Sequence, residues 1–201
     1  MLTTKEAIAA RRSVRRYKPD PVADEIVLEL IDAARLAPSG SNAQPCRFKI
    51  VKEPAVRAQL AEAAHRQRFL AAAPVVLVCC VDLQGYIDGS LSTIEDMHRA
   101  GALSDEMLLT MRERTAALQR IPRGEMGARI ALNMGIAAEH IALRALDFGL
   151  GTCWVRAFDE KQVQALFGWG DNLHVVALMP VGHPDESPPA RRRRPLQDLL
   201  L

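Results

Sequence analysis

The chain has 201 residues, of which 49% are hydrophobic and 25% are charged, a composition that is typical of one soluble globular domain and excludes a disordered chain. Its formal net charge of +2 excludes a global basic field that would attract nucleic acid. The longest uncharged apolar run, at 69–81, is interrupted by Pro74 and is shorter than the roughly 20 residues of a membrane span.

The termini and the cysteines narrow the class further. The charged N-terminal stretch, 1–16, lacks the apolar region of a secretory signal, so we expect a cytoplasmic protein with no membrane partner. The four cysteines, Cys46, Cys79, Cys80 and Cys153, form no CxxC motif or Cys/His cluster. This pattern argues against a zinc site or a disulfide framework, and we expect no bound metal.

The first half of the chain predicts helices and strands in irregular alternation. A short helix at 3–12 leads into a basic stretch, and a second helix at 24–37 begins with two acidic residues and ends before Pro38. A strand at 46–51 and a third helix at 56–64 follow. At 74–81 the sequence PVVLVCCV is apolar throughout, which predicts a strand buried on both faces.

The second half contains the strongest helix and the least certain region. We interpret 84–124 as an excursion or lid with a helix-like middle at 104–120. The apolar stripe at 129–148 predicts a long helix that ends at Gly149. A short strand, a helix and a strand are then expected at 151–155, 159–167 and 173–181. No linker or internal repeat divides the chain, so we expect a single α+β domain over 1–201.

Two segments of the first half carry groups suited to a ligand. Three guanidinium groups and a hydroxyl within 11–15 could bind a phosphate through charge-assisted hydrogen bonds, although a solvated basic turn is the simpler interpretation. The loop PSGSNAQP at 38–45 offers Asn and Gln amides that suit the edge of a flat heterocycle. A capped connecting loop is the alternative here.

Two segments of the second half complete the set. The glycines of GLGTCWVRAF at 149–158 allow a tight helix-to-strand turn, so that the strand backbone can lie against a flat ligand. The alternative is a plain connection with Trp154 in the core. The run of four arginines at 191–194 would by itself indicate an exposed charge run or a nucleic-acid patch, and the low net charge disfavours the patch.

No nucleophile-and-base pair emerges from the sequence. The five histidines are scattered, and none lies in a hydrolase or metal motif. Groups that bind a phosphate and a flat ring, without an acid–base pair, are typical of a protein whose bound cofactor carries the chemistry.

Taken together and in order, four motifs resemble the FMN-dependent nitroreductase family. They are RRSVRRY at 11–17, APSGSNAQP at 37–45, GLGTCWVRAF at 149–158, and PVGHP with RRRRPL at 180–196. The resemblance covers nearly the whole chain, with 84–124 the weak region. It implies a nitroreductase-like fold with a central, mostly antiparallel sheet flanked by helices, and an interlocked homodimer with two FMN sites at the subunit interface.

The resemblance also implies which residues of one subunit contact FMN. Arg11 and Ser13 would bind the phosphate, and Arg12 would contribute through its backbone or a second contact. Arg15 would reach the ribityl chain or the pyrimidine end of the ring and support the reduced flavin. The remaining contacts would be Gln67 (with Arg68 as a rival) at the pyrimidine edge, the backbone of Trp154, Val155, Arg156 and Ala157 beside N5, and Arg191 and Arg193 of the C-terminal extension, 183–201, over the phosphate.

The loop at 38–45 has no obvious partner in its own chain, and the resemblance implies that it lies against the flavin of the other subunit. Its contacts would come from Pro38, Ser39, Ser41, Asn42 and Gln44. Cys46 stands where the family often has an aromatic residue, which would widen the pocket or change its polarity.

The implied activity is ping-pong hydride transfer through flavin N5, from NADH or NADPH to a nitroaromatic, quinone or similar conjugated acceptor. No catalytic side chain is required for it. One alternative is a specialised FMN-dependent dehydrogenase, dehalogenase or enone reductase of the same fold, which 84–124 would decide. The other is a flavin-binding protein without turnover, which would bind FMN and oxidise almost no NAD(P)H.

Overall fold

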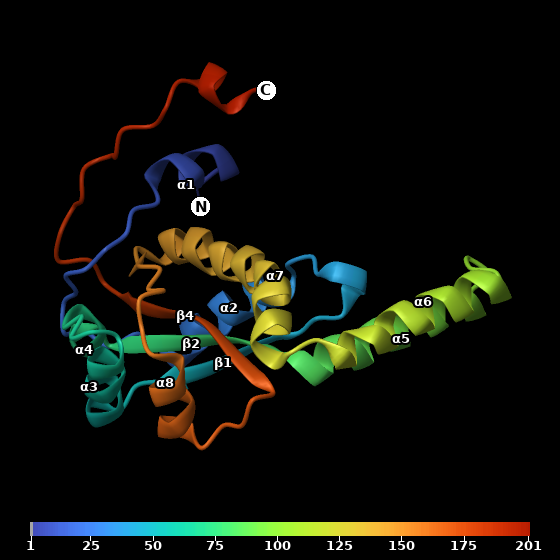
Figure 1. Cartoon of the computed structure of the whole chain (residues 1–201). Coiled ribbons are helices and arrows are strands. Elements are labelled where there is room, and N and C mark those ends of the chain that lie inside the picture. Colours follow the sequence, from blue (N-terminus) through green and yellow to red (C-terminus); the bar gives the residue numbers. More distant parts are fainter. Residues whose placement is uncertain (1) are drawn as a thin grey trace.

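A computed structural model describes residues 2–201, and in that part of the chain four strands form one antiparallel sheet (Figure 1). The sheet order is β1-β2-β4-β3, with β1 at Cys46–Val51, β2 at Val75–Asp82, β3 at Gly151–Thr152 and β4 at Leu173–Gly182. The predicted α+β class and the antiparallel sheet are confirmed. The strands predicted at 46–51, 74–81 and 173–181 agree with the structure to within one residue at each end.

The central strand β2 is buried on both faces, as its apolar sequence predicts. Leu77, Cys79 and Val81 pack into the core cluster on one face of the sheet, together with residues of α2 (Asp24–Arg35) and α7 (Arg123–Arg144). Val78 and Cys80 belong to the cluster on the other face, with α3 (Pro54–Ala63) and α8 (Glu160–Phe167). Helices therefore cover both faces of the sheet.

The remaining helices lie outside this sandwich. They are α1 (Thr4–Ala10), α4 (Phe69–Ala72), α5 (Leu83–Arg99) and α6 (Asp105–Ala117), with short 3₁₀ turns at Gly40–Asn42, Leu118–Arg120, Ala145–Phe148 and Leu196–Leu199. None of the helices in residues 2–201 has both the length and the apolar character that a membrane crossing requires.

The region interpreted as an excursion is a pair of helices, α5 and α6, that projects from the body (Figure 1). The predicted helical middle, 104–120, is confirmed by α6 and the turn after it, whereas α5 was not predicted. Gly85 and Gly89 lie inside α5 and permit close approach: a side chain would meet the carboxylate of Asp82 at the first and the carbonyl of Ala43 at the second.

The long helix α7 begins at Arg123, six residues before the predicted start at 129. Pro122 is its N-cap, Glu125 places negative charge in its first turn, and Met126 is already buried. The two glycines at 124 and 127 obscured this beginning. The predicted end is confirmed, since Gly149 adopts φ +65° after the last turn.

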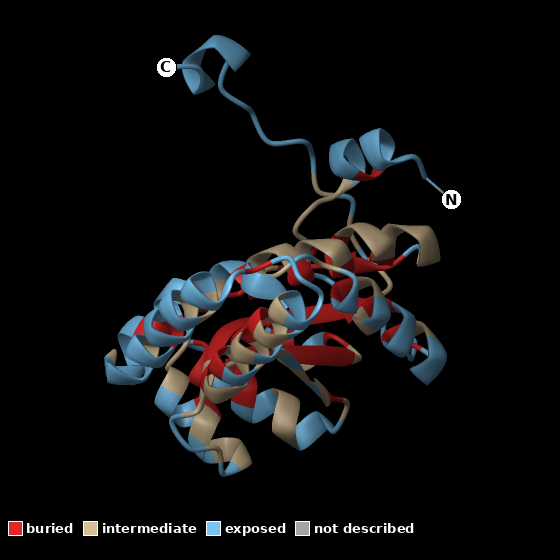
Figure 2. Cartoon of the chain, turned by 90° about the vertical axis from the view of Figure 1, so that its right-hand side faces the viewer, coloured by how far each residue is buried: buried red, intermediate tan, exposed pale blue. Residues whose placement is uncertain are grey.

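The two ends of the chain are joined beside β3 and β4. Val14 N donates to Thr152 O at 2.9 Å, Lys18 N to His183 O at 2.9 Å, and Asp185 N to Arg16 O at 2.9 Å. Beyond this junction the C-terminal extension leaves the body, and its residues from 189 onward are exposed (Figure 2).

Candidate functional site

The basic segment after α1 is held against α7 and β3. Arg11 is half-buried, and its Nε lies 3.1 Å from Oε1 of Glu139 in α7. Arg12 folds back on its own backbone, since Nη1 donates to Ala9 O at 2.7 Å and to Arg11 O at 2.8 Å. Ser13 forms a parallel bridge with Thr152. The three residues predicted to surround a phosphate therefore lie together.

Arg15 lies against the segment before β2. Its guanidinium carbon lies 6.0 Å from the centre of the Phe69 ring, a cation–π distance. Phe69 opens α4 and follows Gln67, so Arg15 and Gln67 come from neighbouring parts of the fold.

The segment after β3 is fixed at three points. Val155 exchanges two backbone hydrogen bonds with Leu178 of β4, at 3.0 and 2.9 Å. The indole Nε1 of Trp154 donates to Oε2 of Glu139 at 3.2 Å. The carbonyl of Ala157 accepts a hydrogen bond from Gln67 Nε2 at 2.9 Å. Arg156 lies between these points and is exposed.

The side chain of Gln67 is already committed as a donor. Its Nε2 donates to Ala64 O at 3.0 Å as well as to Ala157 O, which uses both amide hydrogens. The preceding residues His65 and Arg66 have φ of 56° and 61°, which is an unfavourable backbone conformation for residues other than glycine. The hydrogen bonds of Gln67 help to hold the turn in this conformation. Gln67 can therefore face a ligand only with its acceptor oxygen.

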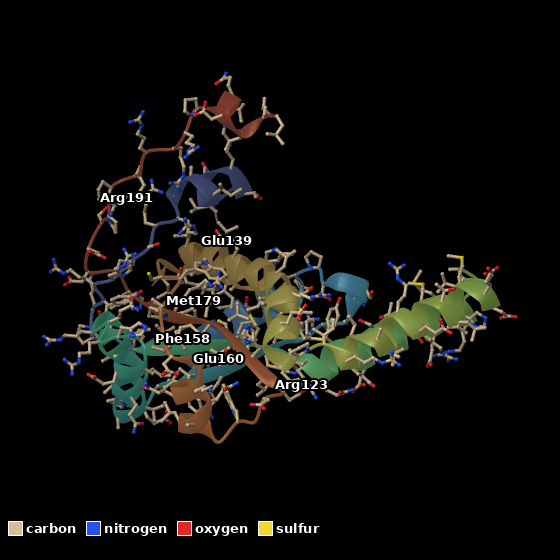
Figure 3. All side chains as sticks on the ribbon, viewed as in Figure 1. Arg123, Glu139, Phe158, Glu160, Met179 and Arg191 are labelled. Atoms are coloured by element: carbon tan, nitrogen blue, oxygen red, sulfur yellow. The ribbon has the colours of Figure 1, made fainter. Side chains whose placement is uncertain are left out.

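Glu139 is the residue that the sequence interpretation missed. It joins Arg11 to Trp154, two predicted site residues that are far apart in sequence. Glu139 itself lies on α7 and is labelled in Figure 3. The available signal was a single carboxylate inside the apolar stretch of α7 at 130–143. Buried or half-buried carboxylates in such positions normally have a partner.

The predicted partner loop lies elsewhere, and the expectation that it has no contact in its own chain is wrong. Gly40 N donates to Oδ1 of the buried Asn133 in α7 at 2.9 Å, and Gln44 N donates to Ser39 Oγ at 3.0 Å. Asn133 precedes Glu139 by six residues, about 9 Å along the helix. The loop is thus anchored to α7 at a different level from Arg11.

The outward groups of this loop are still available to a ligand or a second subunit. Pro38, Ser41, Asn42 and Gln44 are exposed and Ser39 is half-exposed. Ser41, Asn42 and Gln44 also have left-handed φ values of 51°, 47° and 49°. The side chains of this turn are therefore displayed by an unfavourable but anchored backbone.

A cavity of about 240 Å³ lies under the loop, between α2 and β1. It is lined by Ser39, Gln44, Cys46, Phe48 and Asn133, among others. Burial raises the pKa of the Cys46 thiol to about 11, so the thiol stays protonated and behaves as a small apolar group. The small side chain at 46 thus borders this cavity, and the wider or more polar ligand pocket expected from Cys46 stays a prediction.

Arg191 and Arg193 lie in the exposed C-terminal extension. Within residues 2–201, no hydrogen bond joins either of them to Arg11 or Ser13. Figure 3 labels Arg191 on the extension, away from the sheet. Of the predicted phosphate ligands, the structure therefore brings together those near residue 11 but not the C-terminal pair.

The chemistry available at this end of the sheet is that of binding rather than of acid–base catalysis. Burial raises the pKa of Cys153, next to Ser13, and that of Tyr17, so neither supplies an anion near neutral pH. No cluster of three or more metal-ligating side chains occurs among the described residues. Besides the Glu139 carboxylate, which is paired with Arg11 and Trp154, guanidinium groups, a hydroxyl and fixed backbone groups remain. Their donors fit a phosphate and the edge of a flat ring.

Comparisons with known proteins identify the family of the chain. A sequence model described as "Nitroreductase family" matches residues 8–183. An NADH dehydrogenase of Thermus thermophilus is 34% identical, over 100% of this chain and 96% of its own. An NADPH-flavin oxidoreductase of Vibrio harveyi is 28% identical, over 97% of this chain and 71% of its own.

Solved structures share the fold. The NADPH:FMN oxidoreductase of Vibrio harveyi, crystallised with NAD⁺, has a TM-score of 0.75 at 27% identity and covers 98% of this chain and 76% of its own. An Exiguobacterium sibiricum protein assigned to the nitroreductases, solved with FMN, has a TM-score of 0.81 at 22% identity and covers 99% of this chain and 96% of its own.

Proposed function

The chain belongs to the nitroreductase family, and on that premise we propose that it is an FMN-dependent NAD(P)H oxidoreductase. Its acceptors would be nitroaromatic, quinone or similar conjugated compounds. When bound, FMN would take a hydride from NAD(P)H and pass it to the acceptor, with the two substrates using the site in turn.

The observation that carries this proposal is the convergence of three separate segments. Arg11 and Ser13, Gln67, and Trp154 to Ala157 lie at one end of the sheet, joined by Glu139 and by the Gln67–Ala157 hydrogen bond. The first segment offers cationic and hydroxyl donors for a phosphate, and the others offer fixed polar groups for a ring edge.

Each of these residues has a definite task in the proposal. Arg11 and Ser13 bind the phosphate, and Arg12 presents the backbone between them. Gln67 accepts from an N–H of the ring edge, because its donors are occupied. Arg15 supplies positive charge where the reduced ring carries negative charge. The backbone at 154–157 orients the ring.

We also propose a homodimer that completes the site with the loop at 38–45. Leu28 of α2, Leu36 at the C-cap of α2 and Leu132 of α7 are 59%, 67% and 72% exposed, and α2 and α7 pack together. We expect the second subunit to cover these exposed leucines. A second subunit covering them would bring the loop of one chain toward the ring site of the other.

The colour and turnover of the purified protein test the proposal. We expect an FMN absorption spectrum that persists through gel filtration, and steady-state NAD(P)H oxidation with menadione or a nitroaromatic acceptor. A flavin-bound protein with almost no turnover would support a carrier instead. A colourless protein that FMN cannot reconstitute would overturn the assignment.

The C-terminal extension is expected to serve the phosphate. Side chains of an extended segment alternate, so Arg191 and Arg193 would lie on one side and Arg192 and Arg194 on the other. The double variant Arg191→Ala/Arg193→Ala should weaken FMN binding much more than riboflavin binding, since riboflavin has no phosphate. Equal loss from Arg192→Ala/Arg194→Ala would mean that the run acts only as diffuse charge.

A mixed dimer tests the shared site. One subunit carries Arg11→Ala and the other Asn42→Ala, so that one site keeps both wild-type residues and the other loses both. We expect half of the FMN sites to retain wild-type affinity. Equal damage at both sites would show that the loop at 38–45 does not serve the partner's flavin.

A further inference from the structure

We propose that Glu139 is a positioning residue, which holds the Arg11 guanidinium in the orientation that binds the flavin phosphate, and that Trp154 in turn fixes Glu139. The inference rests on the proposed function, because it assumes a phosphate-bearing ligand beside Arg11. It adds a residue that neither the phosphate-binding motif nor the ring-binding motif contains.

The two oxygens of the Glu139 carboxylate have different partners. Oε1 lies 3.1 Å from Arg11 Nε, and Oε2 accepts from Trp154 Nε1 at 3.2 Å. A carboxylate with both oxygens engaged has little rotational freedom. Glu139 also lies on α7, a helix of 22 residues. Two nearby residues of that helix, Ala138 and Ile141, are fully buried. The carboxylate is therefore a fixed point for Arg11.

The contact leaves the rest of the guanidinium available. Arginine has five N–H donors in a rigid fork, and Glu139 engages the Nε edge. Within residues 2–201, the Arg11 Nη groups donate to no protein acceptor. The Arg11 side chain is half-buried, with 23% of its surface exposed, so these groups remain accessible to a ligand.

The electrostatics make the direction of the effect informative. A carboxylate beside a phosphate site repels the dianion, so removal of Glu139 would tighten FMN binding if charge alone mattered. If Glu139 instead keeps Arg11 in place, its removal weakens FMN binding, because a freed arginine must be ordered again when the ligand binds. The two roles predict opposite signs.

The ring contacts are expected to survive the loss of Glu139. Val155 stays paired with Leu178, and Ala157 stays bonded to Gln67, so the backbone at 154–157 has two anchors besides Trp154. Riboflavin, which has the ring but not the phosphate, should therefore bind almost as well to the variant as to the wild type. The ratio of FMN to riboflavin affinity isolates the effect on Arg11.

The experiment titrates FMN and riboflavin into the flavin-free protein and follows flavin fluorescence. We expect Glu139→Ala to weaken FMN binding about tenfold, the lower end of what one charge-assisted hydrogen bond contributes, and to change riboflavin binding less than about twofold. Glu139→Gln keeps one acceptor oxygen and should fall between Glu139→Ala and the wild type. Riboflavin binding also shows that each variant is folded.

The matched control is Glu125→Gln, which removes another carboxylate of α7 that pairs with an arginine, Arg129, at 2.6 Å on the exposed surface. It should leave both affinities unchanged. A second control places Glu139→Ala in an Arg11→Ala background, where it should have no further effect on FMN binding, because the residue through which it acts is absent.

Three outcomes would overturn the inference. They are an unchanged ratio of FMN to riboflavin affinity in Glu139→Ala, tighter FMN binding in either variant, or full additivity with Arg11→Ala. Each of these leaves the proposed function intact if the wild type binds FMN. A wild type that binds neither flavin would overturn the proposed function itself, and the inference with it.

Discussion

Replacement of Asn133 by alanine tests whether the anchored loop stabilises the fold. Asn133 is 9% exposed, accepts from Gly40 N at 2.9 Å and donates to Ile130 O at 2.8 Å. Asn133→Ala removes both bonds and leaves the Gly40 amide half-buried without its partner. Such a loss costs about 2 kcal/mol. For a chain of this length, that lowers Tm by roughly 5 °C.

Part of this cost is expected to return through the loop itself. Ser41, Asn42 and Gln44 hold left-handed φ values, each of which costs about 1 kcal/mol or more in a non-glycine residue. Once Gly40 is free, the loop can relax from this conformation. The net destabilisation should therefore lie between about 1 and 2 kcal/mol, with a large local increase in backbone exchange at 39–44.

Urea unfolding at fixed protein concentration measures the free energy, and hydrogen–deuterium exchange of peptides covering 39–44 measures the loop. Arg129→Ala is the control on the same helix, because its ion pair with Glu125 is exposed and such pairs contribute less than about 1 kcal/mol. If Asn133→Ala were as stable as the control and the loop exchanged at the wild-type rate, the contact would not anchor the loop.

Three further predictions concern stability and reactivity. The Cys46 thiol has a pKa of about 11, so at pH 8 it should react with a thiol reagent about 200-fold more slowly than an ordinary cysteine. The reaction rate, followed by absorbance, should increase as the pH rises. Gly127→Ala should destabilise the folded protein by about 1–2 kcal/mol because the added methyl group would collide with His174. Gly124→Ala on the same helix has open space around it and should stabilise the fold slightly. Comparable urea midpoints for the two variants would contradict this. Tyr17→Phe should cost about 1–2 kcal/mol in the same assay, since its buried hydroxyl donates to a backbone carbonyl at 2.6 Å, and an unchanged midpoint would refute it.

The elements that local sequence predicts well are those whose side chains alone determine burial. The strand at 74–81 is apolar at every position, and the strand at 46–51 alternates, so their positions follow from the pattern. The helix α5 could not be predicted in this way. Its glycines disfavour a helix locally. They are required because the Asp82 carboxylate and the Ala43 carbonyl lie where a side chain would be, and the Ala43 contact exists only once distant segments are packed.

The candidate site shows the same division. The phosphate-binding and ring-binding segments can be recognised from their residue types, but their connections cannot. Glu139 has partners 128 residues before it and 15 residues after it in the chain. Gln67 reaches Ala157 across 90 residues. No spacing rule connects such pairs. The two hydrogen bonds that the Gln67 amide donates likewise form only in the packed fold.

The junction between the two ends of the chain determines when the proposed site can form during protein synthesis. Backbone groups of residues 14–18 bond to Thr152, His183, Asp185 and the carboxylate of Glu186. Contacts of such sequence separation form late in folding. The ribosome delivers Arg11 and Ser13 well before Glu139 and Thr152, which contact them, and before the C-terminal segment that pairs with residues 15–18. On the proposed site, a translation product that stops before residue 183 would lack the pairing of residues 15–18 and should bind FMN more weakly than the full chain.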